Sequence, residues 1–357
     1  MDRIRVLVVE DSLSVRKRLI EVLASDAAFE VIGEAENGQQ AIEMCRALRP
    51  NVVTLDMHLP ILDGVSATEH IMGHFPTPIL IVSSSTNRGD LFKTYDALAA
   101  GAVDVLEKPT GEEPDGVWEK KFLSAVRLVS KIRVITHVRA RLGGPGATRV
   151  ESAPLTLATL PEHGRSVIAL GASTGGPGAL VEVLRRVPRG LPATVLIVLH
   201  IDEPFSSAFA EWLGNQTGHA VCYAVGGEAL APSGKGRVLM APPGRHLVAR
   251  AGRLALSSEA ERHSCRPSVD VLFESLAAEC ARQTVACLLT GMGRDGASGL
   301  LALRRAGAYT IAQDEASSVI YGMPREAALL GAADSILALA EIGPAVARAA
   351  VKTGSPV

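Results

Sequence analysis

The chain has 357 residues, of which 47% are hydrophobic and 21% charged, and its formal net charge is −2 at pH 7. This length exceeds what one hydrophobic core usually serves, so we expect two domains. A net charge so close to zero gives no electrostatic reason to expect nucleic acid or an anionic membrane as a partner. The sequence also has no apolar run near the roughly 18 residues that a membrane span needs.

The five cysteines, at positions 45, 222, 265, 280 and 287, show no C-x-x-C spacing. This pattern favours neither a disulfide framework nor a zinc site, and it predicts buried thiols in a reducing cytoplasm. The first apolar run meets Glu10 and Asp11 at once, which is typical of a buried strand and not of a signal peptide. We therefore expect a cytoplasmic protein, with no nucleic-acid partner and no direct membrane insertion.

The first third of the chain alternates between two hydrophobic patterns. Apolar runs predict strands at residues 4–10, 29–36, 51–56, 78–84 and 103–109. Apolar residues at helical spacing predict helices at 12–26, 38–49, 65–75 and 90–100, and a fifth helix from residue 117 toward residue 140. Five strands that alternate with helices predict a parallel sheet covered on both faces.

The composition changes after this region. Residues 143–164 are rich in Gly, Pro, Ala, Ser and Thr and have no sustained period, which indicates an interdomain linker. A second α/β set follows, with strands expected at 166–173, 193–200, 220–225, 236–242, 284–291 and 308–314, and a hairpin at 246–258. We expect a first domain at 1–125, its fifth helix extending toward 140, a linker at 140–164 and a second domain at 165–350.

Polar side chains collect at the ends of the predicted strands of the first domain. Glu10 and Asp11 end the first strand and Asp56 ends the third, at the edge where open parallel sheets bind ligands. Three carboxylates there would repel one another without a hard cation, and Mg²⁺ prefers such oxygen ligands. Ser83 and Lys108 end the fourth and fifth strands beside the same point. Each residue alone is explained as a turn former or helix cap, but the five together favour a ligand site.

Residues 1–125 thus resemble a response-regulator receiver domain, which implies a five-stranded, flavodoxin-like parallel sheet. The resemblance implies that Asp56 accepts a phosphoryl group from a histidine kinase, with Mg²⁺ held by Glu10, Asp11 and Asp56. It also implies that Ser83 and Lys108 bind the phosphoryl oxygens.

Two positions depart from the receiver pattern. Leu59 stands where the family usually has Met before Pro60, which is a volume-conserving change. Val105 occupies the position where many receivers carry an aromatic switch residue. This departure disfavours the aromatic rotation of other receivers and leaves the expectation of phosphorylation unchanged.

The stretch GASTGGPG, residues 171–178, lies between a predicted strand and a predicted helix and allows three interpretations. A phosphate-binding P-loop would need a lysine where Pro177 stands. A dinucleotide turn of the short-chain dehydrogenase type would need a Tyr-x-x-x-Lys pair, which none of the four tyrosines forms. The third interpretation is G-x-S-x-G at 171–175, a nucleophile elbow that exposes Ser173, with the next helix N-terminus supplying N–H groups for an oxyanion.

A serine nucleophile needs a base. The next predicted strand ends at His200, whose ordinary pKa lies near neutrality, and a later strand leads into the loop GMGRDG, which contains Asp295. Asp295 could hold the imidazole tautomer and stabilise the imidazolium. Taken singly, His200 reads as a surface histidine and Asp295 as a turn residue. The chain order Ser, His, Asp differs from the order of α/β-hydrolases and disfavours ordinary lipase or esterase ancestry.

Residues 165–350 resemble the chemotaxis-type protein-glutamate methylesterases, the CheB family. The resemblance is carried by GASTGG, the strand that ends at His200, CRPSVDVLF (265–273), TGMGRDGASG (290–299) and AQDEASSVIYGMPREA (312–327). It implies a doubly wound, mainly parallel sheet, Ser173 as nucleophile, His200 as general base and acid, and Asp295 as the orienting carboxylate. It implies no cofactor in this domain. One departure is local: Leu199-His200-Ile201-Asp202 replaces the family's common Gln-His-Met-Pro, which can alter the pKa of His200 or receptor docking.

The resemblance implies a phosphorylation-regulated serine esterase that hydrolyses glutamate γ-methyl esters on the cytoplasmic helices of methyl-accepting chemoreceptors. The products are glutamate and methanol, and the reaction gives chemotactic adaptation. The family also deamidates receptor glutamines, and the sequence leaves that second activity open for this chain. The alternative is a non-enzymatic regulator with a vestigial esterase domain. A DNA-binding output is disfavoured because residues 165–357 contain no basic recognition helix.

Overall fold

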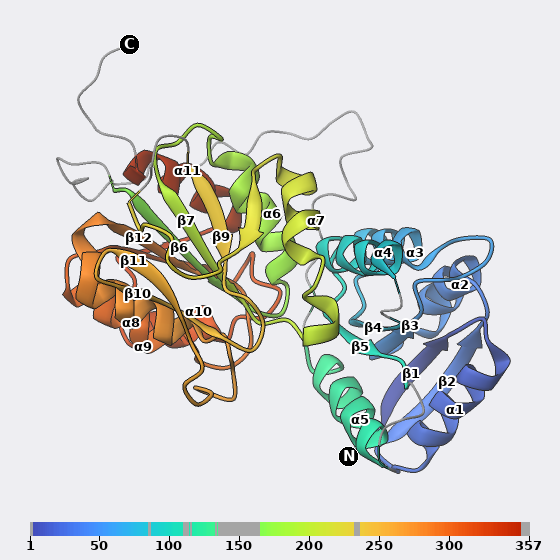
Figure 1. The fold of residues 1–357 in the computed structure, drawn as a ribbon. Coiled ribbons are helices and arrows are strands. Elements are labelled where there is room, and N and C mark those ends of the chain that lie inside the picture. The colour runs from blue at the N-terminus through green and yellow to red at the C-terminus, as the bar shows by residue number, and fades with distance from the viewer. Residues whose placement is uncertain are drawn as a thin grey trace, which may run out of the picture. The chain divides into compact units, whose positions relative to one another are not determined.

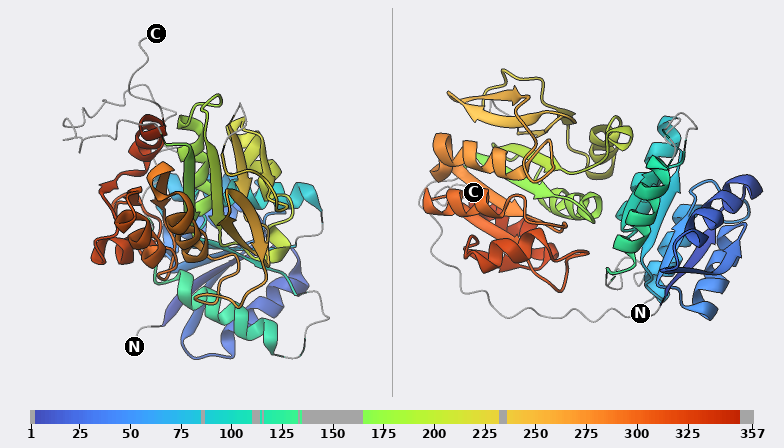
Figure 2. Two further views of the ribbon diagram at one scale, coloured as in Figure 1. Left: turned by 60° about the vertical axis from the view of Figure 1, so that its left-hand side comes forward. Right: turned by 90° about the horizontal axis from the view of Figure 1, so that it is seen from below.

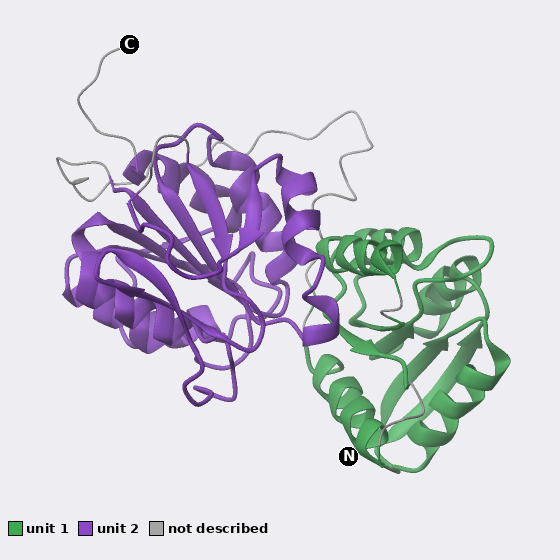
Figure 3. Ribbon diagram, in the orientation of Figure 1, with its two compact units in different colours: residues 1–148 green, residues 149–357 purple. Residues whose placement is uncertain are grey.

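The computed structural model describes residues 3–84, 87–109, 114, 116–132, 134, 165–231 and 236–350. The chain divides into two compact units, residues 1–148 and 149–357, which we describe separately (Figure 3). The predicted linker at 140–164 lies outside the described residues. The fifth helix ends at Val129, and of the expected extension beyond that residue only 130–132 and 134 are described. Among the described helices, none is long and apolar enough to cross a membrane.

The first unit is a five-stranded parallel sheet in the order β2-β1-β3-β4-β5, which confirms the predicted architecture (Figure 1). The strands are β1 (Ile4–Val9), β2 (Phe29–Ala35), β3 (Val52–Leu55), β4 (Ile79–Ser83) and β5 (Asp104–Glu107). The helices are α1 (Leu13–Ala24), α2 (Gly38–Leu48), α3 (Gly64–His74), α4 (Arg88–Ala99) and α5 (Val117–Val129). Helix α1 contacts α5, whereas α2 contacts α3 and α3 contacts α4, so the helices form two groups that cover the two faces of the sheet.

Local sequence explains where several of these helices begin. Asn37, Asp63 and Asn87 precede α2, α3 and α4, and each side chain accepts a hydrogen bond from the main-chain N–H three residues later. Such caps satisfy N–H groups that have no partner inside the helix. Strand β3 is entirely buried, as expected for a strand covered on both faces.

The second unit contains a seven-stranded sheet in the order β14-β13-β12-β6-β7-β9-β8, and every neighbouring pair of strands is parallel. Its strands are β6 (Val167–Ala172), β7 (Thr194–Leu199), β8 (Val221–Tyr223), β9 (Arg237–Met240), β12 (Thr284–Leu288), β13 (Tyr309–Gln313) and β14 (Ser335–Leu337). The predicted doubly wound sheet is confirmed. The short edge strand β14 was not predicted.

The α-helices among the described residues of this unit cover the sheet in two groups. They are α6 (Gly176–Arg186), α7 (Phe209–Thr217), α8 (Val269–Cys280), α9 (Ala297–Arg305), α10 (Met323–Leu329) and α11 (Leu339–Ala350). Helix α6 contacts α7 and α11, and α9 contacts α8 and α10. The expected hairpin is β10 (His246–Arg250) and β11 (Arg253–Ser257), a separate antiparallel pair beside α8 (Figure 2).

The order of the strands decides which loops meet. Strand β6 lies between β7 and β12, with Ala172 paired to Leu199 and Gly171 paired to Leu288. From β6 the chain continues to β7 on one side, and it returns to β12 on the other, so β6 and β12 flank the point where the strand order reverses. Ligands of open parallel sheets bind at the carboxyl ends of the strands at such a point. The loops after β6, β7 and β12 therefore share one edge.

Candidate functional sites

Ser173 follows β6 directly and is held in a tight turn at the start of α6. Its main-chain N–H donates to the Thr290 carbonyl at 3.0 Å, which ties it to the loop after β12. Gly175, the residue before α6, has φ of 76°, and a Cβ there would lie 2.6 Å from the Cβ of Val319. Glycine is therefore required at this position both by conformation and by space. The turn leaves Ser173 half-buried at the helix N-terminus.

His200 follows β7, and its main-chain N–H donates to the Ala172 carbonyl at 3.0 Å, one residue before Ser173. The side chain of His200 is 15% exposed, and its Nε2 lies 2.9 Å from Oδ2 of Asp295. The structure therefore joins the predicted base to the predicted carboxylate, although the two lie 95 residues apart in the sequence.

Asp295 is 2% exposed and sits at the N-terminus of α8. Its Oδ1 accepts from the Ser268 hydroxyl at 2.7 Å and from Asp270 N–H at 3.1 Å, and its Oδ2 accepts from Val269 N–H at 2.7 Å. Helix N-termini stabilise anions through such free N–H groups and through the helix dipole. Burial alone would raise the pKa of Asp295, but the contacts with His200, Ser268 and Val269 outweigh it and hold the pKa below its usual range.

The ionised carboxylate of Asp295 in turn raises the pKa of the His200 imidazole. Burial would lower the pKa of His200, but the hydrogen bond to Asp295 and the contact with Cys265 outweigh it and raise the pKa to about 9. His200 is thus an imidazolium at neutral pH in this arrangement. To act as a base it must first lose a proton.

The third member of the predicted triad is not yet connected. In the structure the Ser173 hydroxyl makes no hydrogen bond to His200, and Nδ1 of His200 instead faces the Cys265 thiol at 3.8 Å. Because Nε2 is held by Asp295, Nδ1 is the nitrogen left to exchange a proton. Hydrogen bonds between a nucleophile and its base are often long or absent before substrate binds.

The segment 265–273, which carries part of the family resemblance, supplies three contacts that the sequence did not assign. Ser268 caps α8 and binds Asp295, and Cys265 faces His200. Asp270, fully buried, accepts from Gly299 N–H at 2.7 Å and lies 3.1 Å from Nε2 of His263, so it joins α8 to α9. A serine directly before a helical pattern was a signal for the cap, whereas nothing in the sequence indicated the contact of Cys265.

All five cysteines are free, as expected. The prediction that they are all buried is wrong, because only Cys45 and Cys287 are buried, Cys265 and Cys280 are half-buried, and Cys222 is exposed. Cys222 lies on β8, one of the two edge strands of the sheet, where a side chain has a neighbouring strand on one side only.

The acidic cluster of the first unit is also assembled at one sheet edge. One ligand oxygen from each of Glu10, Asp11 and Asp56 lies within 4.8 Å of the others. Nζ of Lys108 is 2.8 Å from Glu10 and 2.9 Å from Asp56. Ser83 is fully buried, and its hydroxyl has no hydrogen-bond partner among the described residues.

This cluster fits a hard divalent cation. All three donors are carboxylates, and Asp11 is exposed, which suits an ion that keeps several waters. Burial, reinforced by Asp56, outweighs Lys108 and raises the pKa of Glu10 to about 7. The positive charge of Lys108 alone therefore does not balance the carboxylates of this site, and a bound cation would stabilise their ionised forms.

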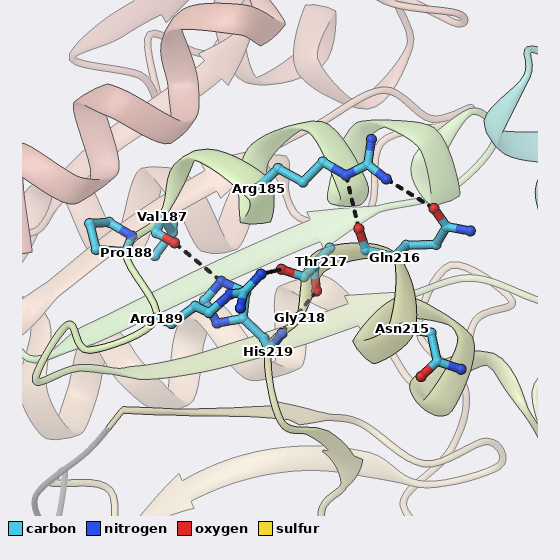
Figure 4. Close-up of a pocket in the computed structure, with 9 residues that line it drawn as sticks. All are labelled: Arg185, Val187, Pro188, Arg189, Asn215, Gln216, Thr217, Gly218 and His219. Carbon is cyan, nitrogen blue, oxygen red and sulfur yellow. Dashed lines mark hydrogen bonds between the residues drawn. The ribbon is translucent and has the colours of Figure 1, made fainter.

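A separate hollow of about 350 Å³ lies at the C-terminal end of α6 (Figure 4). Two of its side chains contact main-chain carbonyls: Arg185 donates to Gln216 O at 2.9 Å, and Nε2 of His219 lies 3.0 Å from Leu184 O and 3.1 Å from Val187 O. These contacts satisfy carbonyls at a helix end, and we assign the hollow no functional role.

Together, the two units define a response regulator whose output domain is an α/β hydrolytic enzyme with serine, imidazole and carboxylate at one sheet edge. Residues 6–114 match the response regulator receiver domain, and residues 168–346 match the CheB methylesterase. The chain belongs to the CheB methylesterase family.

Relatives match the chain over nearly its whole length. The protein-glutamate methylesterase/protein-glutamine glutaminase of Nitrosospira multiformis is 41% identical over 98% of both chains. The protein-glutamate methylesterase/protein-glutamine glutaminase 2 of Anaeromyxobacter dehalogenans is 42% identical over 95% of both. Among solved structures, the CheB methylesterase catalytic domain of Thermotoga maritima is 30% identical, with a TM-score of 0.48 over 52% of this chain and 98% of that one.

Proposed function

We propose that the chain is a phosphorylation-regulated serine esterase that hydrolyses glutamate γ-methyl esters on the cytoplasmic helices of chemoreceptors. The observation that carries the proposal is the pairing of His200 with a buried, helix-capped Asp295 at the sheet edge that also bears Ser173. Family membership supports the same substrate class. We propose that it acts in the cytoplasm, with the receiver at 1–125, the linker at 140–164 and the esterase at 165–350.

The reaction follows from the arrangement of the ring nitrogens. The Ser173 oxygen attacks the ester carbonyl, its proton passes to Nδ1 of His200, and Asp295 holds Nε2 and stabilises the resulting imidazolium. N–H groups at the start of α6 face the developing oxyanion. The imidazolium then protonates the departing methoxide. Water hydrolyses the acyl-serine by the same route and leaves glutamate.

Two conditions must be met before this chemistry starts. His200 must be neutral, although its pKa lies at about 9, and Nδ1 must turn from Cys265 toward Ser173. We propose that substrate binding brings the serine and the imidazole into contact. The same acyl route, with ammonia leaving, would deamidate a receptor glutamine.

In the receiver, we propose that the Asp56 carboxylate attacks the phosphorus of a phosphorylated histidine kinase, and the phosphorus–nitrogen bond of the donor breaks. Glu10, Asp11 and Asp56 would hold Mg²⁺, which supplies positive charge beside the phosphoryl oxygens when bound. Ser83 offers its hydroxyl, for which the described residues supply no hydrogen-bond partner, and Lys108 offers its ammonium to those oxygens. We propose that the esterase has an active and a restrained state. Phosphorylation of the receiver changes the rate of hydrolysis only if it stabilises one of these two states more than the other.

The test is methanol release from membranes that carry methylated receptors. We expect the full chain to release methanol, and we expect the rate of release to rise when a small-molecule phosphodonor is added. Ser173→Ala should release none. Asp56→Asn is the matched control, because it should keep basal release and lose only the response to the phosphodonor. Methanol release by Ser173→Ala equal to the wild type would refute the esterase mechanism. A non-enzymatic regulator would in addition resist labelling of Ser173 by an organophosphonate.

A further inference from the structure

The side of His200 that faces away from Asp295 carries a second, unassigned arrangement. The Cys265 thiol is half-buried and lies 3.8 Å from Nδ1 of His200. One ligand atom from each of His200, Cys265 and Asp295 lies within 4.8 Å of the other two. Thiolate, imidazole and carboxylate are the ligands that Zn²⁺ and related cations take in proteins.

The distances fit a cation held between sulfur and nitrogen. Zinc binds thiolate sulfur at about 2.3 Å and imidazole nitrogen at about 2.0–2.1 Å, so tetrahedral geometry separates the two ligand atoms by about 3.6 Å. The observed separation of 3.8 Å is close to that value. Little movement of Cys265 or His200 would be needed to close the site.

Asp295 contributes from outside the coordination shell. Its two oxygens already accept from Ser268, Val269 and Asp270 and contact Nε2 of His200. A carboxylate on the second ring nitrogen is the usual support of a metal-binding histidine, because it fixes the tautomer and leaves the other nitrogen free to bind. Both Cys265 and His200 are partly exposed, so water can complete the coordination.

We propose that Cys265 and His200, supported by Asp295, bind a divalent cation of the Zn²⁺ class, and that the bound cation inhibits the esterase. Binding releases the thiol proton of Cys265 and the Nδ1 proton of the His200 imidazolium to solvent, and it forms sulfur–metal and nitrogen–metal bonds. The inhibition rests on the proposed function: the cation occupies the lone pair of Nδ1 that must accept the Ser173 proton. The binding itself does not rest on it.

Co²⁺ tests the binding, because a thiolate–cobalt bond gives a charge-transfer band in the near ultraviolet. After chelator treatment, titration of the full chain with Co²⁺ should produce this band with one equivalent of metal. Ser173→Ala should keep it, and both Cys265→Ser and Cys265→Ala should lose it. Cys222→Ser, at an exposed thiol outside the site, is the matched control and should keep it. Co²⁺ in the receiver cannot mimic the result, since Glu10, Asp11 and Asp56 offer no sulfur.

Zn²⁺ tests the inhibition. Zn²⁺ should suppress methanol release, and a chelator should restore it. With each protein's rate expressed as a fraction of its rate without Zn²⁺, Cys265→Ser should require at least a tenfold higher Zn²⁺ concentration for half-inhibition than the wild type. Absence of the band in the wild type, or its persistence in both Cys265 variants, would overturn the site. A band without any methanol release by the wild type would instead count against the proposed function and leave the cation site standing.

Discussion

The hydroxyl of Ser268 donates to Oδ1 of Asp295 at 2.7 Å, so the residue that caps α8 also holds the carboxylate facing His200. The side chain of Ser268 therefore serves two elements at once. It accepts from Val271 N–H within its own helix, and it fixes a buried anion that belongs to the loop after β12.

Ser268→Ala should accordingly destabilise the protein and slow hydrolysis together. We expect the free energy of unfolding to fall by about 1–3 kcal/mol, because a helix cap and a hydrogen bond to a buried charge are both lost. Methanol release should fall because Asp295 is less firmly positioned. Denaturant titration and steady-state kinetics measure the two effects. Ser268→Thr keeps the hydroxyl and should stay near the wild type; if it behaves like Ser268→Ala, the hydroxyl is not the cause.

The contact of Nε2 of His200 with Asp295 predicts that activity is limited at neutral and lower pH and rises toward alkaline pH. With a pKa of about 9, the base form of His200 becomes abundant only above neutrality. The rate of organophosphonate labelling at Ser173 should rise with pH, with its midpoint at about pH 9 and a plateau above it. It is measured with chelator present so that no cation occupies Nδ1. In Asp295→Asn the imidazole loses its anionic partner, so the midpoint should move to lower pH and the plateau should fall by about 10³–10⁴-fold. An unchanged midpoint in Asp295→Asn would contradict this explanation.

The same pair predicts how stability depends on pH. The pKa of His200 is about 9 in the folded chain, against 6.5 for the unperturbed group, so folding favours the protonated form. The resulting stabilisation is fully present below about pH 6.5 and is lost as the pH rises through 9. It amounts to about 3 kcal/mol. Unfolding free energies from pH 6 to 10 should therefore fall more steeply for the wild type than for His200→Gln, and parallel curves would refute the prediction.

Sequence patterns predicted the strands and the loops at their ends, because buried parallel strands appear as continuous apolar runs and place their carboxyl ends at one edge. Ser173, His200 and Asp295 could be grouped in this way without coordinates. The edge strand β14 was missed, since its three residues are too few to show a pattern.

What sequence could not predict are contacts that depend on side-chain direction. Which ring nitrogen of His200 meets Asp295, and that the other meets Cys265, follows from the rotation of one imidazole. Spacing along the chain carries no information on it. The same holds for Ser268, whose partner lies 27 residues away.

Substitution of Ser83 should change the phosphorylation rate and the stability of the receiver in different ways. Its fully buried hydroxyl has no hydrogen-bond partner among the described residues, so Ser83→Ala removes an unsatisfied polar group. We expect stability to be unchanged or to rise by about 1–3 kcal/mol, while phosphorylation by a small phosphodonor slows about tenfold. Thr94→Val removes another such hydroxyl, from α4, and should leave phosphorylation unchanged. Equal phosphorylation of Ser83→Ala and the wild type would exclude a phosphoryl-binding role.

Gly291, the first residue of the loop that carries Asp295, limits how closely that loop can approach the nucleophile. A Cβ at this position would lie 2.7 Å from the Cβ of Ser173 and 2.4 Å from the sulfur of Met323. The Met323 side chain is flexible, but the Cβ of Ser173 is fixed to its main chain, so the added methyl group would push on the Ser173 turn. Gly291→Ala should therefore cost about 1–3 kcal/mol of stability and slow organophosphonate labelling at least tenfold. The control is Gly190→Ala, where a Cβ meets nothing within 4 Å and both quantities should stay near the wild type. The main-chain N–H of Ser173 also donates to Thr290, the residue before Gly291. An unchanged labelling rate in Gly291→Ala would therefore mean that the two loops move together, and that their close packing does not position the serine.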